Sequence, residues 1–84
     1  MSDKKAIFIR DYAKSLVLAG KTCSLCDFAS VLNAAGFGHY VSHARGMGRV
    51  VSAAYRRLHA RGVECWQILD AFVGNSGKVL WMNK

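Results

Sequence analysis

A chain of 84 residues accommodates one small domain with a single core. With 52% hydrophobic and 20% charged residues, the composition is that of a globular protein and excludes a disordered tail. The net charge of +7 favours a polyanionic partner, whereas no apolar run approaches the roughly 18 residues that cross a bilayer, so no membrane association is predicted.

Two helices are predicted in the first half of the chain, at about residues 3–19 and 24–35. A glycine follows each of them, Gly20 and Gly36, as is common directly after a helix. Both segments have apolar residues at helical spacing. These are Ile9, Tyr12, Ala13 and Leu16 in the first segment and Leu25, Phe28, Ala29, Leu32 and Ala35 in the second.

The second helix has two candidate N-cap residues. Ser24 is followed by an acidic residue, Asp27, in the pattern of a capping box. Thr22 has a hydroxyl that could serve instead. The sequence leaves both open.

A third helix is predicted at about residues 46–61, ending before Gly62. Its apolar stripe is formed by Met47, Val50, Val51, Ala54 and Leu58. Another face carries Arg49, Ser52 and Arg56, which follow one another at the spacing of one and two helical turns. The helix is therefore amphipathic, with a basic side opposite an apolar one.

The C-terminal part predicts a small hairpin. Residues 63–70 fit either one or two further helical turns or the start of a strand. Beyond them, β-prone runs at 71–73 and 79–81 flank a turn rich in glycine, which indicates a hairpin at about 71–82. The fold class predicted for residues 1–84 is a single mainly α domain with a small β-hairpin, in the element order of a three-helix winged helix-turn-helix.

The distribution of charge points to a nucleic acid. No acidic residue occurs between Asp27 and Glu64, a stretch that contains five arginines and three histidines. Charged helix faces are usually no more than solvated surface, but such faces commonly contain Glu–Lys pairs one turn apart, and the third helix has none. A helix of this kind suits a DNA groove, because phosphates attract its cations and its side chains reach base edges.

Two segments resemble a known family. Residues 30–36, Ser-Val-Leu-Asn-Ala-Ala-Gly, and the basic segment 45–58 are similar to the helix-turn-helix and winged-helix DNA-binding domains of small bacterial or phage regulators and recombinases. The resemblance implies a transcriptional regulator or a recombination accessory factor. The loop between Gly36 and Gly46 is longer than the turn of about three to four residues in a simple helix-turn-helix, which favours a winged or atypical form.

In the expected complex with double-stranded DNA, the helix at 46–61 enters the major groove. Its side chains nearest the bases would be Arg49, Ser52, Ala53 and Arg56. The cations that would bind the phosphate backbone are Arg45, Arg57, Arg61, Lys78 and Lys21, with Lys78 next to the turn of the hairpin. Such proteins often bind two half-sites as homodimers, although the sequence contains no evident dimerisation segment.

Two cysteines and two histidines have the spacing of a zinc finger, C-x2-C-x12-H-x3-H: Cys23, Cys26, His39 and His43. The intervening sequence argues against a finger, because a helix begins where a finger needs a hairpin and glycines precede the first histidine. We therefore predict no metal or other cofactor, with zinc at these four residues as the open alternative. An odd number of cysteines without a secretory signal predicts reduced thiols and a cytoplasmic location.

Two other classes of function remain open. The same basic surface could bind an acidic protein, in an interaction module or inhibitor, or it could bind RNA. DNA binding differs from binding to an acidic protein, because the logarithm of the DNA affinity falls linearly with the logarithm of the salt concentration. It differs from RNA binding by a preference for duplexes over hairpins or single strands. No pair of acidic residues has the spacing of a general acid and base, so neither enzymatic activity nor a small-molecule substrate is predicted.

Overall fold

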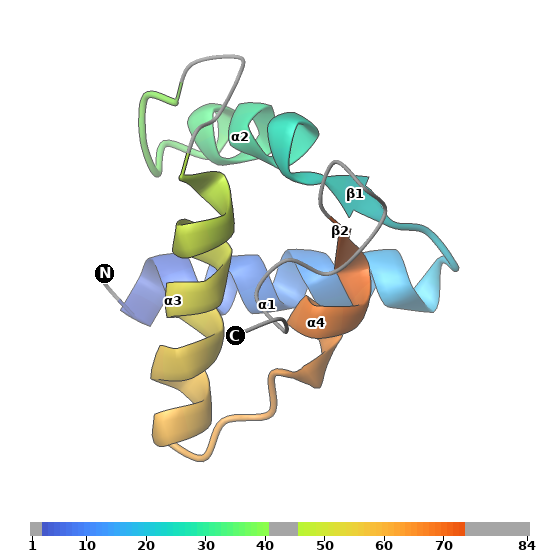
Figure 1. The fold of residues 1–84 in the computed structure, drawn as a ribbon, viewed down its shortest axis with the longest axis vertical. Helices are drawn as coiled ribbons and strands as arrows, with labels where there is room; N and C mark the ends of the chain where they lie inside the picture. The colour runs from blue at the N-terminus through green and yellow to red at the C-terminus, as the bar shows by residue number, and fades with distance from the viewer. Residues whose placement is uncertain (1–2, 41–45, 74–84) are drawn as a thin grey trace.

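The computed structural model describes residues 3–40 and 46–73 (Figure 1). The elements in these two ranges are, in chain order, α1 (Asp3–Leu18), β1 (Cys23–Ser24), α2 (Leu25–Ala34), α3 (Met47–Ala60), α4 (Trp66–Ala71) and β2 (Phe72–Val73). The protein is mainly helical, as the sequence predicts. Helices α1, α2 and α3 begin and end within one residue of the expected bounds.

The C-terminal elements differ from the expected hairpin. The segment that the sequence left open forms helix α4, which includes Ala71 and leaves only Phe72–Val73 extended. Strand β2 pairs in parallel with β1, so that Cys23 lies opposite Phe72. A two-residue strand directly before α2 has no alternation pattern, and the sequence therefore did not indicate this pairing. The expected antiparallel partner, residues 79–81, lies outside the described residues.

Glycines end the three long helices. The Val63 N–H donates to the Leu58 carbonyl across the end of α3 (2.9 Å), and Gly62 between them has a φ of +72°. A side chain with a Cβ is strained at this φ, so a glycine is favoured where the chain reverses. Gly20 and Gly36 take the same conformation after α1 and α2. At the other end of α2, Ser24 is the N-cap, and its Oγ accepts a hydrogen bond from the backbone N–H three residues ahead (3.1 Å).

The connection that follows α2 is anchored on α1 and α2. The Asn33 side chain donates to the Tyr40 carbonyl and accepts from the Tyr40 N–H, both at 2.7 Å, in the manner of a strand partner. The Tyr40 hydroxyl accepts a hydrogen bond from Lys5, and the Phe37 ring lies 5.0 Å from that of Phe8. The first part of the connection, up to Tyr40, therefore packs against α1 and α2.

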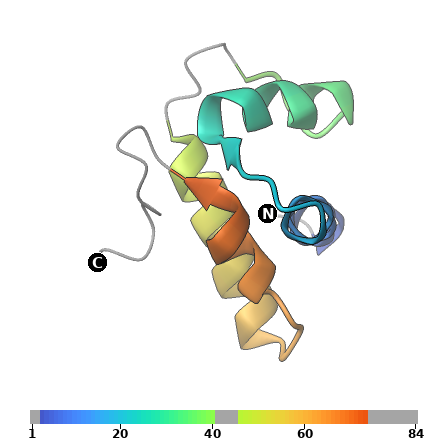
Figure 2. The same cartoon turned by 90° about the vertical axis from the view of Figure 1, so that its right-hand side faces the viewer.

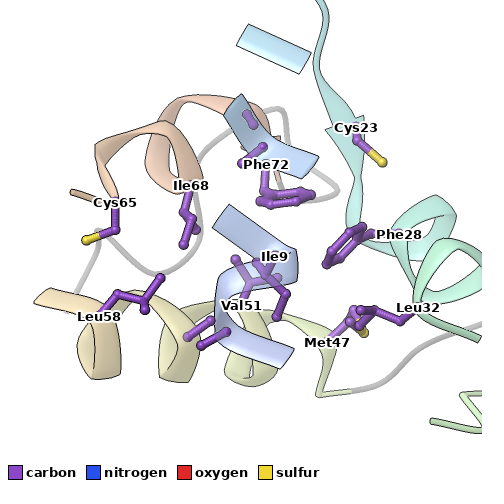
Figure 3. Packing of buried hydrophobic residues seen from close by; sticks show 14 of the residues in the cluster. Ile9, Cys23, Phe28, Leu32, Met47, Val51, Leu58, Cys65, Ile68 and Phe72 are labelled. Carbon is purple, nitrogen blue, oxygen red and sulfur yellow. The ribbon is translucent and has the colours of Figure 1, made fainter. Parts of the chain in front are cut away.

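The core forms where α3 and α4 pack against α1, with α2 closing one end (Figures 1 and 2). Its largest fully buried side chains are Phe28, Phe72, Ile9, Leu32, Met47, Leu58, Ile68 and Val51 (Figure 3). Phe28 lies between the rings of Tyr12 and Phe72, with centroids at 5.3 and 4.5 Å. The core thus joins all four described helices and β2.

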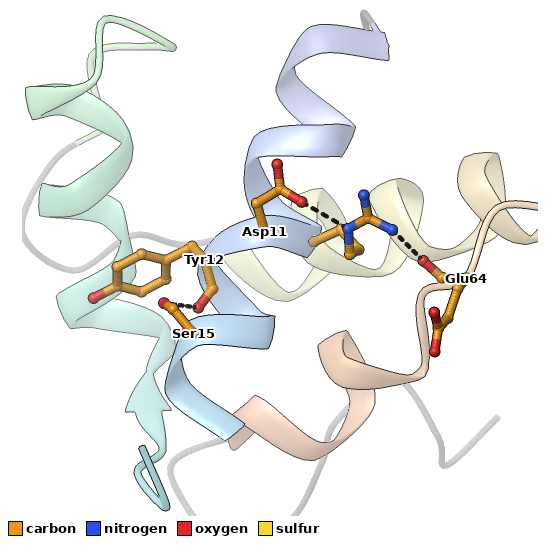
Figure 4. A network of polar contacts seen from close by, with 5 residues as sticks. Asp11, Tyr12, Ser15 and Glu64 are labelled. Carbon is orange, nitrogen blue, oxygen red and sulfur yellow. Dashed lines mark hydrogen bonds and ion pairs between the residues drawn. The ribbon is translucent and has the colours of Figure 1, made fainter. Parts of the chain in front are cut away.

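A polar contact fixes the segment between α3 and α4 on α1. The Arg10 guanidinium donates through Nη1 to the Glu64 carbonyl oxygen and through Nε to Asp11, both at 2.8 Å (Figure 4). Because Glu64 lies just before α4, this contact ties the connection between α3 and α4 to α1. Arg10 therefore has a structural role in this fold.

Two leucine truncations test the placement of the core. Leu32 in α2 is fully buried, whereas Leu18 at the end of α1 is 79% exposed. We expect Leu32→Ala to lower the free energy of unfolding by about 2–5 kcal/mol, because it removes buried methyl groups and leaves a cavity. Leu18→Ala should change it by less than about 0.5 kcal/mol. Urea unfolding followed by circular dichroism measures both, and equal effects of the two variants would contradict the described core.

Candidate nucleic-acid interface

Two arginines form the outermost ridge of α3. Arg49 and Arg56 are exposed, whereas Met47, Val51 and Leu58 on the opposite side are buried against the core. Because seven residues make almost two helical turns, the two arginines project in nearly the same direction, about 10 Å apart along the axis. We call Arg49 and Arg56 the arginine ridge.

The two arginines of the ridge differ in their contacts. Within residues 3–40 and 46–73, Arg49 has no hydrogen-bonding or ion-pairing partner. Arg56 donates through Nη1 to the Ser52 hydroxyl (2.9 Å). This contact holds Arg56 along the helix, so one guanidinium of the ridge is positioned while the other extends into solvent.

Ser52 does not share the exposed face on which the sequence placed it. Only 7% of Ser52 is exposed, although it lies only about 60° around the helix axis from Arg49. Its hydroxyl supports Arg56 and is not presented to solvent. Ala53 lies on the other flank of the ridge and is half-buried.

Arg57 of α3 and Arg61, which directly follows the helix, contact an acidic residue from α1. Asp3 accepts from Arg57 Nε at 2.5 Å through Oδ1 and pairs with Arg61 Nη1 at 3.2 Å through Oδ2. The hydrogen bond from Arg57 lowers the pKa of the Asp3 carboxyl, and the charges of Arg57 and Arg61 add to this effect. Since the pKa is lowered, the attraction is present above the ordinary pKa of an aspartate and is lost as the pH falls through the lowered value.

The other predicted phosphate contacts are placed only in part. Lys21 is exposed in the segment between α1 and β1. Arg45 and Lys78 lie outside the described residues. The structure therefore groups four of the predicted cations on α3, two on the ridge and two beside Asp3.

Sequence reasoning missed two features of this surface. It found no acid near the arginines, because Asp3 is 54 residues before Arg57 and approaches only through the packing of α1 against α3. The second feature is a stacking contact of Tyr55. The Tyr55 ring stacks on His59, one turn further along α3, with centroids 5.6 Å apart. Aromatic residues four positions apart on a helix are the signal for this stack.

The residues of the zinc-finger pattern are arranged differently from a finger. Cys23 is buried in β1, and its thiol donates to the Ser24 carbonyl oxygen (3.3 Å), whereas Cys26 and His39 are exposed. His43 lies outside the described residues. In the described ranges, no group of three or more histidine, cysteine, aspartate or glutamate side chains is placed to hold a metal ion.

Comparisons with known proteins assign no family. No protein-family model matches the chain, and searches of curated proteins and of solved structures find no match. Among the helices of the described ranges, none combines the length and the apolar character needed to cross a membrane.

Thiol reactivity tests the arrangement around β1. Burial raises the pKa of the Cys23 and Cys65 thiols, which lowers their thiolate fraction, and it also shields them from reagents. We expect Ellman's reagent at pH 8 to modify Cys26 rapidly in the folded protein and the other two thiols only after denaturation. The variant Cys26→Ser should lose the rapid phase. Rapid modification of two or three thiols in the native protein would contradict the described burial.

Proposed function

We propose that the protein binds double-stranded DNA in the cytoplasm, as a small transcriptional regulator or recombination accessory factor. The arginine ridge is the observation that carries this proposal. Arg49 and Arg56 stand opposite the buried face of α3, so packing of the core directs both guanidinium groups outward. Outward arginines on a helix are suited both to phosphates and to guanine edges.

The dimensions of α3 are compatible with a major groove. The helix has 14 residues and no acidic side chain, and small residues adjoin the ridge at Ala53 and Ala60. Small side chains allow the helix backbone to approach the floor of a groove about 12 Å wide. Arginine forms bidentate hydrogen bonds with guanine O6 and N7, so each arginine of the ridge can both attract phosphates and select a base.

The arrangement of elements supports a winged-helix variant as the fold type within this proposal. Strand β1, between α1 and α2, pairs with the strand that follows α4, which is where a wing would begin. The proposed phosphate contacts still include Lys21, before β1, together with Arg45 and Lys78, which lie outside the described residues. Ser52 is left out of the base-contacting set because it is buried.

An acidic protein is the second candidate partner. The contact of Asp3 with Arg57 and Arg61 favours it, because these two arginines already pair with a carboxylate within the protein. A partner with clustered aspartate or glutamate residues would offer the same group. The two candidates differ in their response to salt, because DNA binding releases condensed counterions and follows a linear logarithmic law.

Substitutions on the ridge test DNA binding. We expect Arg49→Ala and Arg56→Ala each to weaken binding to duplex DNA several-fold or more, because each removes a phosphate or base contact. Lys14→Ala is the matched control, since it removes one positive charge from an exposed position on α1. Fluorescence anisotropy across a salt titration, with duplexes selected from a random library and with unselected duplexes, measures the affinities. Equal affinity of the wild type and the Arg49→Ala/Arg56→Ala variant would refute the placement on the ridge.

A charge-conserving variant separates base contacts from phosphate contacts. Arg49→Lys keeps the positive charge but lacks the planar fork that reads guanine. If Arg49 contacts a base, this variant retains the salt dependence of binding and loses preference for the selected duplex. Unchanged preference would assign Arg49 to the phosphates. Absence of any affinity for duplex DNA near physiological salt would favour the acidic protein instead.

A further inference from the structure

Arg57 and Arg61 form a small site that is already occupied by an anionic group of the chain itself. They lie one helical turn apart, at the end of α3, and bind different oxygens of a single carboxylate, that of Asp3. Two guanidinium groups that converge on one oxyanion are also the arrangement with which arginines bind phosphate. The Asp3 carboxylate thus stands where an oxyanion of an external ligand would be held.

We infer that Arg57 and Arg61 are a binding site for a backbone phosphate of nucleic acid, and that Asp3 acts as an internal competitor for this site in the free protein. The inference rests on the proposed function for the source of the phosphate. The geometry of Arg57 and Arg61 around an oxyanion is observed whether or not the protein binds DNA.

Exposure makes the contact with Asp3 replaceable. The side chains of Arg57, Arg61 and Asp3 are 36%, 56% and 48% exposed, so an external anion can reach the guanidinium groups. Exposed ion pairs contribute little to folding, and the fold therefore does not depend on keeping this one closed. The contact of Arg10 is less accessible than that of Asp3. The Arg10 side chain is only 21% exposed and donates to the backbone carbonyl of Glu64, just before α4.

The position of the site is continuous with the arginine ridge. Arg57 directly follows Arg56, and the segment from Met47 to Arg61 contains no acidic residue of its own. Asp3 is brought to this segment by the packing of α1 against α3, and it lowers the positive charge of one flank of the helix. Nucleic acid that engages the ridge would meet this flank next, and its phosphates would compete with the carboxylate for the same donors.

Asp3 also has a structural role at the start of α1. An acidic residue in the first turn of a helix interacts favourably with the helix dipole, and Asp3 begins α1. A test must therefore separate the binding of anions from the stability of α1. Asp3→Asn removes the charge, and Asp3→Ser does the same with a side chain that is well suited to a helix N-terminus.

The first measurement compares affinities for a duplex of about 20 base pairs by fluorescence anisotropy, with thermal melts to confirm folding. Asp11→Asn is the matched control, because it removes one negative charge from α1 at a residue paired with Arg10 and not with α3. We expect Asp3→Asn and Asp3→Ser to bind roughly two- to fivefold more tightly than Asp11→Asn, as expected for the loss of a competing surface ion pair. Adding Arg57→Gln and Arg61→Gln should abolish this gain.

The second measurement does not depend on DNA binding. Inorganic triphosphate is titrated into isotopically labelled protein while the side-chain Nε–Hε resonances of Arg57 and Arg61 are followed by NMR. We expect saturable shifts of these resonances in Asp3→Asn, and smaller shifts at the same concentrations in the wild type and in Asp11→Asn.

The outcomes separate the two proposals. If no variant binds DNA but triphosphate shifts the two resonances in Asp3→Asn, the proposed function fails. Arg57 and Arg61 are then an anion site with Asp3 as its competitor, but the source of the anion is not nucleic acid. If the wild type binds DNA while Asp3→Asn behaves as Asp11→Asn in both measurements, the site is refuted and the proposed function survives. A response to triphosphate without a gain in DNA affinity would overturn the assignment of the site to nucleic acid.

Discussion

The packing of α3 across α1 is the constraint on which the surface of this protein depends. Val51 and Leu58 are buried in that contact, and a helix that buries one side must present the opposite side to solvent. The guanidinium groups of Arg49 and Arg56 are directed outward for this reason. The same packing brings the first turn of α1 to the end of α3, where Asp3 meets Arg57 and Arg61. The packing of α3 against α1 thus leaves Arg49 and Arg56 exposed and places Arg57 and Arg61 beside a carboxylate.

Features that depend on neighbouring residues could be predicted from the sequence. Apolar residues three and four positions apart marked the helices, and glycines such as Gly36 and Gly62 marked where the chain adopts a positive φ. Ser24 was one of two expected N-caps, and its hydroxyl makes the capping hydrogen bond. These signals are local because helix hydrogen bonds and caps join residues only a few positions apart.

Features that depend on tertiary contact could not be predicted. The exposure of Ser52 was expected from its spacing to Arg49, but burial on the flank of a helix depends on what packs beside it. The pairing of β1 with β2 joins Cys23 to Phe72 across most of the chain, and two residues are too few to show a strand pattern. The pairing of Asp3 with Arg57 could not be predicted either, because the two residues are distant in sequence and meet only in the folded chain.

The central claim is that the outward side of α3 meets duplex DNA. Its most direct test is a map of backbone amide shifts in an NMR titration of labelled protein with a short duplex selected for binding. If α3 is the interface, the largest shifts follow its outer side, at Arg49, Ala53 and Arg56, and spare the exposed side of α1 around Lys14. Shifts centred on α1 or α4, with α3 unaffected, would contradict it.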